Sequence, residues 1–190
     1  MNAPLDAEAE ADLRRLEADL LGDRPPALRP EAGAEAFRQH KILASAIHRA
    51  ARLHQRNQES ETNAWVSYLT DFFPEGRNGP DDARVLFGDW RTPLLKDNTL
   101  GPRVVVTHGQ SVAHWSRDES GATVCIDLES LWDDFTHSVQ RFLDHLRGSE
   151  ARRRVVLARW RQKTWEVGFL SAGGATAVSG AAGWPSRRPT

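Results

Sequence analysis

The sequence predicts an α+β fold: N-terminal helices, then an antiparallel sheet of about five strands with a long amphipathic helix packed on it. Three observations predict this arrangement. A β-branched run at residues 103–108 is bounded by turn residues on both sides, as strands are. Apolar residues recur with helical spacing over residues 128–146. Alternating apolar residues at 164–170 are typical of a further strand.

The first three strands are expected to form an antiparallel meander. The chain would turn at Gly109-Gln110, because glycine at the first central position suits a type II′ turn, and return over residues 111–117. Asp118 to Gly121 would form a second turn, since Asp, Ser and Gly bend the chain at little cost. Residues 122–126 would be the third strand.

The helix after the meander is the most strongly periodic segment. Ser130 with Asp133 resembles a capping box, Asp127 is an alternative N-cap, and Gly148 marks the end of the helix. Three- and four-residue steps place eight apolar residues on one face, which we expect to cover the sheet: Leu128, Leu131, Trp132, Phe135, Val139, Phe142, Leu143 and Leu146.

The segment after Gly148 is compatible with both strand and helix. Val155-Val156-Leu157 favours a strand over Arg153 to Trp160, and the alternation over Thr164 to Leu170 favours a second one. We therefore expect a hairpin that turns at residues 161–163. Pro80 is expected to begin an earlier helix that ends before Pro93, because the residue preceding a proline disfavours helical backbone.

The predicted domain organisation has three parts. Residues 1–30 form an acidic helical arm with a Pro-rich linker, residues 31–170 form a single α+β domain, and residues 171–190 form a flexible tail rich in Gly, Ala and Ser. This order of elements resembles that of small dimeric secretion chaperones and related α+β folds, a resemblance that implies a dimer.

Charge is segregated between the first two predicted helices. Residues 1–35 contain nine acids and four bases, whereas residues 36–58 contain no acid and five bases. At about 100° per residue the five bases fall within an arc of about 80°. One interpretation, which we favour, is a charge-cancelling αα-hairpin. The other is a binding face for nucleic acid or an acidic partner, made by Arg38, Lys41, Arg49, Arg52 and Arg56.

Composition narrows the class of protein. The net charge is −1, and no stretch is long and apolar enough to cross a bilayer. The N-terminus lacks a basic-then-apolar export signal, and the lone Cys125 excludes an intramolecular disulfide. We therefore expect a cytoplasmic protein without membrane partners.

The candidate catalytic groups are histidines and nearby acids. The sequence lacks a GxxxxGK[ST] loop, GxGxxG, HExxH and GxSxG. His108, His114 and His137, with Asp133 or Asp134, remain as a possible acid–base or metal site. Strand alternation would place His108 and His114 on opposite faces of the sheet. Spacing also makes Asp133 and His137 part of an ion-pair ladder on the helix surface, so no metal or cofactor is expected.

The function favoured by these observations is a noncatalytic protein-interaction or regulatory module whose partner is another protein, including a second copy of itself. Two alternatives remain open. One is a nucleic-acid-binding protein that uses the basic face of residues 36–57. The other is a small enzyme built around His108, His114 and His137.

Overall fold

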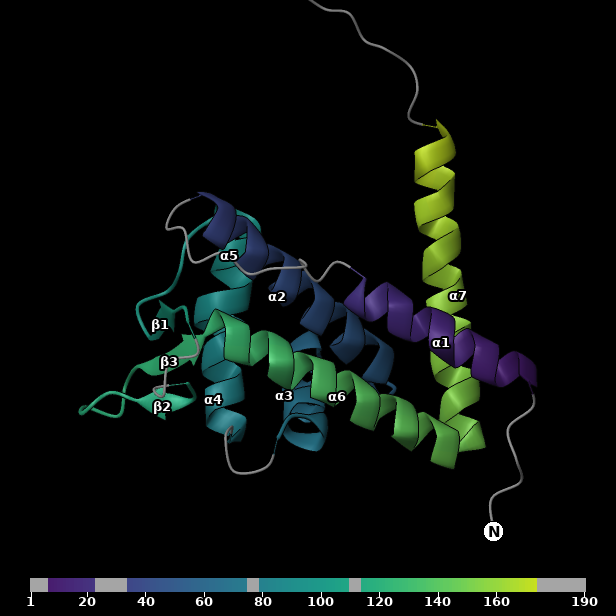
Figure 1. Ribbon diagram of the computed structural model, residues 1–190, viewed down its shortest axis with the longest axis horizontal. Coiled ribbons are helices and arrows are strands. Elements are labelled where there is room, and N and C mark those ends of the chain that lie inside the picture. Colours follow the sequence, from purple (N-terminus) through teal and green to yellow (C-terminus); the bar gives the residue numbers. More distant parts are fainter. Residues whose placement is uncertain (1–6, 23–33, 75–78, 110–113, 174–190) are drawn as a thin grey trace, which may run out of the picture.

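The computed structural model describes residues 7–22, 34–74, 79–109 and 114–173, and within them the surroundings of the side chains at 7–22, 37–74, 79–109 and 114–162. Helices make up most of this chain, and a small sheet lies at one end of the helical body, with α7 at the other (Figure 1). The helical segments are α1 Ala7–Leu21, α2 Ala34–His54, α3 Glu61–Phe72, α4 Pro80–Val85, the π-helical η1 Leu86–Arg91, α5 Thr92–Asp97, α6 Leu128–Gly148 and α7 Glu150–Gly173. The strands are β1 Val104–Thr107, β2 Ser116–Arg117 and β3 Val124–Asp127.

The sheet is mixed and small, so the predicted five-strand antiparallel sheet is wrong. In the described residues it has three strands in the order β1-β3-β2. β1 pairs parallel with β3, from Val104 opposite Val124 to Thr107 opposite Asp127, and β2 pairs antiparallel with β3. The meander failed because β3 lies between the other two strands. β3 carries the buried Val124 and Ile126, and a buried central strand needs a hydrogen-bonding neighbour on both sides.

The predicted C-terminal hairpin is also wrong, because residues 150–173 form one helix, α7. Val156 and Leu157 are buried against the helical core, and Trp160 packs beside them one turn later. This spacing follows the helical period, and a Glu150–Arg154 pair four residues apart supports the first turns. The β-branched residues favoured a strand, but β propensity is a weak preference that tertiary packing overrides.

α6 matches its prediction in extent and in its buried face, but not in what it covers. All eight of the apolar residues predicted to share a face are buried, and the Asp127 side chain accepts a hydrogen bond from Ser130 N at 3.0 Å as the N-cap. This face packs mainly on α1, α3 and α7, and to a smaller extent on α2 and β3. Because the predicted meander and hairpin do not form, the element order on which the resemblance to secretion chaperones was based is not present.

Pro93 does not end its helix, contrary to expectation. α4, η1 and α5 run without a break from Pro80 to Asp97. Pro93 has no N–H to donate to the carbonyl of Asp89, four residues earlier, and Gly101 N donates to this oxygen instead, at 2.6 Å. The wider π-helical turn accommodates the proline. A Cβ on Gly101 would lie 2.7 Å from Asp89 Cα, so the close approach requires glycine.

A buried hydrogen bond links α3 to α6 inside the aromatic core. Ser138 Oγ donates to Phe135 O at 2.8 Å, so its lone pair is available to the Tyr68 hydroxyl at 3.1 Å. Tyr68 is therefore the donor. Burial raises the pKa of Tyr68 well above its ordinary value, so the phenol remains protonated.

We predict that Tyr68→Phe lowers the free energy of unfolding by about 1 kcal/mol, because a buried acceptor loses its donor. Urea unfolding followed by tryptophan fluorescence measures the change. Ser138→Ala in both backgrounds completes a double-mutant cycle. Strictly additive losses would show that the two side chains do not interact.

Candidate functional site

α2 is the helix at the centre of the molecule. It packs against α1, α3, α5, α6 and α7. On the side of α2 opposite its five basic residues (the basic stripe), the apolar residues are buried: Leu43, Ala46, Ile47, Ala50 and Leu53. At about 100° per residue the buried positions occupy about half of the helix circumference. The five basic residues lie outside that half.

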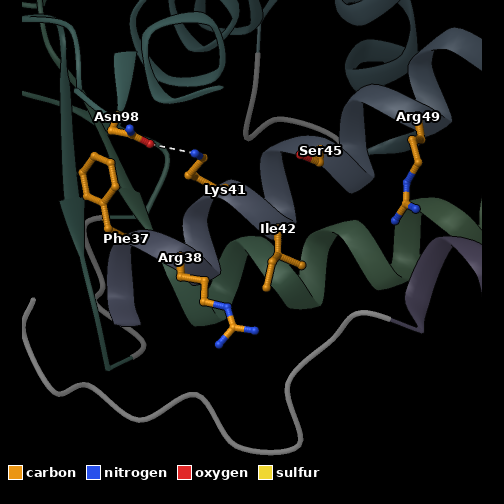
Figure 2. Close-up of a pocket in the computed structure, with 7 residues that line it drawn as sticks. All are labelled: Phe37, Arg38, Lys41, Ile42, Ser45, Arg49 and Asn98. Atoms are coloured by element: carbon orange, nitrogen blue, oxygen red, sulfur yellow. Dashed lines mark hydrogen bonds between the residues drawn. The ribbon is translucent and has the colours of Figure 1, made fainter. Parts of the chain in front are cut away.

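A hollow opens along the first half of the exposed α2 face. Its volume is about 730 Å³, and we call it the α2 groove (Figure 2). It is lined by Phe37, Arg38, Lys41, Ile42, Ser45, Arg49 and Asn98. Three of the five predicted basic residues therefore belong to one groove, together with two large apolar side chains that the sequence analysis did not associate with them.

The groove combines fixed and exposed groups. Lys41 Nζ donates to Asn98 Oδ1 at 2.7 Å, which ties α2 to the end of α5. Asn98 has a left-handed backbone (φ 55°) and forms the C-cap of α5. Arg38, Ile42 and Arg49 point to the same side of α2, with Ile42 between the two guanidinium groups (Figure 2). An apolar side chain flanked by positive charges can hold a ligand that is both apolar and acidic.

The other two predicted basic residues line a second hollow at the end of α2. We call it the C-terminal hollow; its volume is about 430 Å³. Its residues come from the end of α2, the loop after it and α7: Arg52, Leu53, Gln55, Arg56, Asn57, Gln58, Arg159 and Gln162. The basic stripe is therefore divided into an apolar-lined groove and a polar hollow. α7 was not expected at this site, because residues 153–160 had been predicted as a strand.

The acidic helix α1 directs its charges to α6 and α7. Glu10 accepts from Arg147 Nη2 at 3.0 Å, and Asp12 accepts from Arg161. The hydrogen bond from Arg147 holds the pKa of Glu10 below its ordinary value. Leu13, Leu16 and Leu20 anchor α1 in the core. In the described part of the chain, these ion pairs do not form the charge-cancelling αα-hairpin between α1 and α2 that we favoured.

The predicted histidines do not form one site. His114 is built into the structure: its Nδ1 accepts from Asp127 N, and its Nε2 donates to Asp134 Oδ2, each at 3.0 Å. His137 is exposed on α6, and Asp133 lies half-buried on the same helix. In the part of the chain that the structure describes, no three His, Cys, Asp or Glu side chains are placed to hold a metal ion.

His108 lies instead against a histidine that the sequence analysis did not select. The rings of His108 and His40 are 5.4 Å apart, edge to face, and His40 is 3% exposed. Neither ring nitrogen of His40 has a hydrogen-bond partner. Helical spacing could have indicated this burial, because His40 shares the side of α2 that carries Leu43 and Ile47. The pKa of His40 is lowered to about 4, mainly by desolvation and also by the nearby His108, while Asp127 opposes both effects.

Comparison with known proteins identifies no relative: no protein-family model, curated protein or solved structure matches this chain. Among the helices described by the structure, none has both the length and the apolar character needed to span a bilayer. The geometry of the two hollows is therefore the best indication of what the protein binds.

The buried His40 predicts loss of stability in acid. Its pKa is lowered from 6.5 to about 4, so the unfolded chain binds this proton first as the pH falls. The free energy of unfolding therefore decreases as pH falls from about 6.5 to about 4, by roughly 3 kcal/mol for this group. His40→Leu is expected to reduce the loss between pH 7 and pH 5 by roughly 2 kcal/mol.

Urea unfolding at the two pH values measures this difference, and His137→Gln serves as the matched control because His137 is exposed. If the free energy of unfolding of His40→Leu depends on pH as it does in the parent protein, the lowered pKa of His40 is contradicted. His54 is a second buried histidine with a pKa lowered by desolvation, and it remains in both variants.

Proposed function

We propose that this protein is a noncatalytic binding module that holds an acidic segment of another protein in the α2 groove, with an apolar side chain of that segment between Arg38 and Arg49. The observation that carries the proposal is the placement of Ile42 between two guanidinium groups in one open groove (Figure 2). We also propose that the protein is cytoplasmic and that its role is accessory or regulatory.

Charge complementarity supports an acidic partner. None of the described residues that line the groove is acidic, and residues 36–58 contain no acid. Acids of the adjacent α1 are engaged by Arg147 and Arg161 on α6 and α7. Opposite charge on a partner would speed association and select it against basic or neutral proteins.

Apolar lining favours a protein over a nucleic acid. Phe37 and Ile42 are half-buried on the exposed side of α2 and provide a surface for an aliphatic or aromatic side chain. Buried apolar anchors dominate the energetics of protein–protein interfaces. Nucleic-acid-binding domains are usually strongly basic, whereas the pI of this chain is about 6.7. Nucleic-acid binding is therefore the less favoured alternative, and the binding experiment below includes DNA to test it.

The small-enzyme alternative receives less support from the geometry. Both His114 ring nitrogens are engaged by Asp127 and Asp134, and His137 is exposed on the surface of α6. The remaining pair, His40 and His108, lies outside the residues that line the two hollows.

We predict that a labelled acidic peptide with one central leucine binds the protein and that the double variant Arg38→Glu/Arg49→Glu binds it about tenfold more weakly, which corresponds to about 1.4 kcal/mol. Reversing two charges replaces attraction by repulsion on both sides of Ile42. Replacement of the leucine by serine is expected to weaken binding by a similar factor, because the apolar contact is lost. Fluorescence anisotropy measures the affinities.

The matched control is Arg154→Glu, because Arg154 is an exposed arginine of α7 that is not part of the groove. It should bind the leucine peptide as the parent protein does. Binding of labelled duplex DNA is measured in parallel to test the nucleic-acid alternative. Tighter binding of DNA than of peptide, or equal losses in the control and in the double variant, would overturn the proposal. Light scattering of the protein alone tests whether a second copy is the partner.

A further inference from the structure

We infer that the C-terminal hollow is a binding site for a phosphate monoester. The hollow is separate from the α2 groove and does not depend on the function proposed for it. Arg52 and Arg56 from the end of α2 and Arg159 from α7 line it, together with residues that carry side-chain amides, among them Asn57 and Gln162.

Arg159 is fixed in position by the chain itself. Its Nη1 donates to Leu53 O at 3.4 Å and to Gln55 O, and its Nη2 donates to Asn57 Oδ1 at 3.4 Å. These contacts satisfy carbonyls at the end of α2 and hold a positive charge at the edge of the hollow without a mobile side chain. Arg159 therefore serves both the fold and the electrostatics of the hollow.

Arg52 and Arg56 supply the adjustable donors. Arg52 is exposed, and Arg56 is held only by an ion pair with Asp71 Oδ2 at 3.9 Å, which is longer than a hydrogen bond. They are four residues apart on α2 and thus lie on the same face, one turn from each other. Two guanidinium forks one turn apart can each donate two hydrogen bonds to the oxygens of a single phosphoryl group.

The local charge favours an anion. Three guanidinium groups outweigh the nearby carboxylates of Asp71 and Glu59 together with the partial negative charge of the α2 C-terminus, which is about half an elementary charge. The nearby Glu59 is engaged by Arg56 N and Ser67 Oγ, each at 2.8 Å. The hollow has polar walls apart from Leu53, so it suits a hydrogen-bonding group rather than an apolar one. A carboxylate has two acceptor oxygens and one charge, whereas a phosphate monoester has three oxygens and up to two charges, so the phosphate suits two guanidinium forks better.

The test measures binding of inorganic phosphate, phosphoserine and acetate to the full chain by isothermal titration calorimetry. We expect phosphate and phosphoserine to bind at least tenfold more tightly than acetate. The affinity for phosphoserine should increase as pH rises through about 6, where the second ionisation occurs. Arg52→Ala/Arg56→Ala should abolish this preference.

Arg49→Ala is the matched control, since Arg49 lies on the same helix but lines the α2 groove, and it should leave phosphate binding unchanged. Arg159 is left intact because its replacement would disturb α2. An unchanged urea midpoint in Arg52→Ala/Arg56→Ala establishes that the fold is retained. Equal affinities for phosphate and acetate, or phosphate binding unaffected in this double variant, would overturn the inference.

Two further ligands identify the source of the phosphoryl group. Tighter binding of a phosphoserine peptide than of adenosine monophosphate supports a phosphorylated protein partner, and the reverse order supports a nucleotide or other small phosphate. Single-stranded DNA carries phosphodiesters, which are monoanionic. Binding of the DNA with higher affinity per phosphate than phosphoserine would contradict a monoester site.

Discussion

The structure depends above all on the burial of α2 over about half of its circumference. Ala44, Ala46, Ala50 and Ala51 are almost wholly buried along this helix. Small side chains at a helix–helix contact shorten the distance between helix axes, so neighbouring helices can approach α2 closely from several sides. Because the apolar half of α2 is committed to the core, its charged residues can lie only on the opposite half. The groove and the hollow are consequences of that packing.

The acids of α1 and the bases of α2 have different roles. Their opposite charges predicted that the two helices would neutralise each other, but the acids of α1 pair with other helices. Acids of α1 form ion pairs with Arg147 of α6 and Arg161 of α7, which hold α1 across these two helices. The Glu10–Arg147 pair is partly exposed, and pairs of this kind contribute little stability, typically under about 1 kcal/mol. The leucines of α1 provide its main attachment, and the charge pairing determines its orientation.

Sequence patterns predicted the helices better than the strands. The eight apolar residues of α6 have a single consistent period, and α2 was recognised for the same reason. Strand order could not be predicted from residues 103–126, because a parallel pairing of β1 with β3 depends on long-range packing rather than on turn residues. Residues 153–160 combine β-branched side chains with helical spacing, and the packing of Val156 and Leu157 determines the outcome. The basic stripe was predicted, but its division into two hollows requires α7.

Thiol accessibility along α2 tests the central claim most directly. In a Cys125→Ser background, single cysteines would replace Ser45, Arg49 or Arg52 on the outer face, and Ala46 or Ala50 on the buried face. The account predicts rapid modification of the three outer cysteines and protection of the two inner ones by about tenfold or more, because a buried thiol reacts only when the structure opens. Equal rates on both faces, or protection of the outer cysteines, would contradict it.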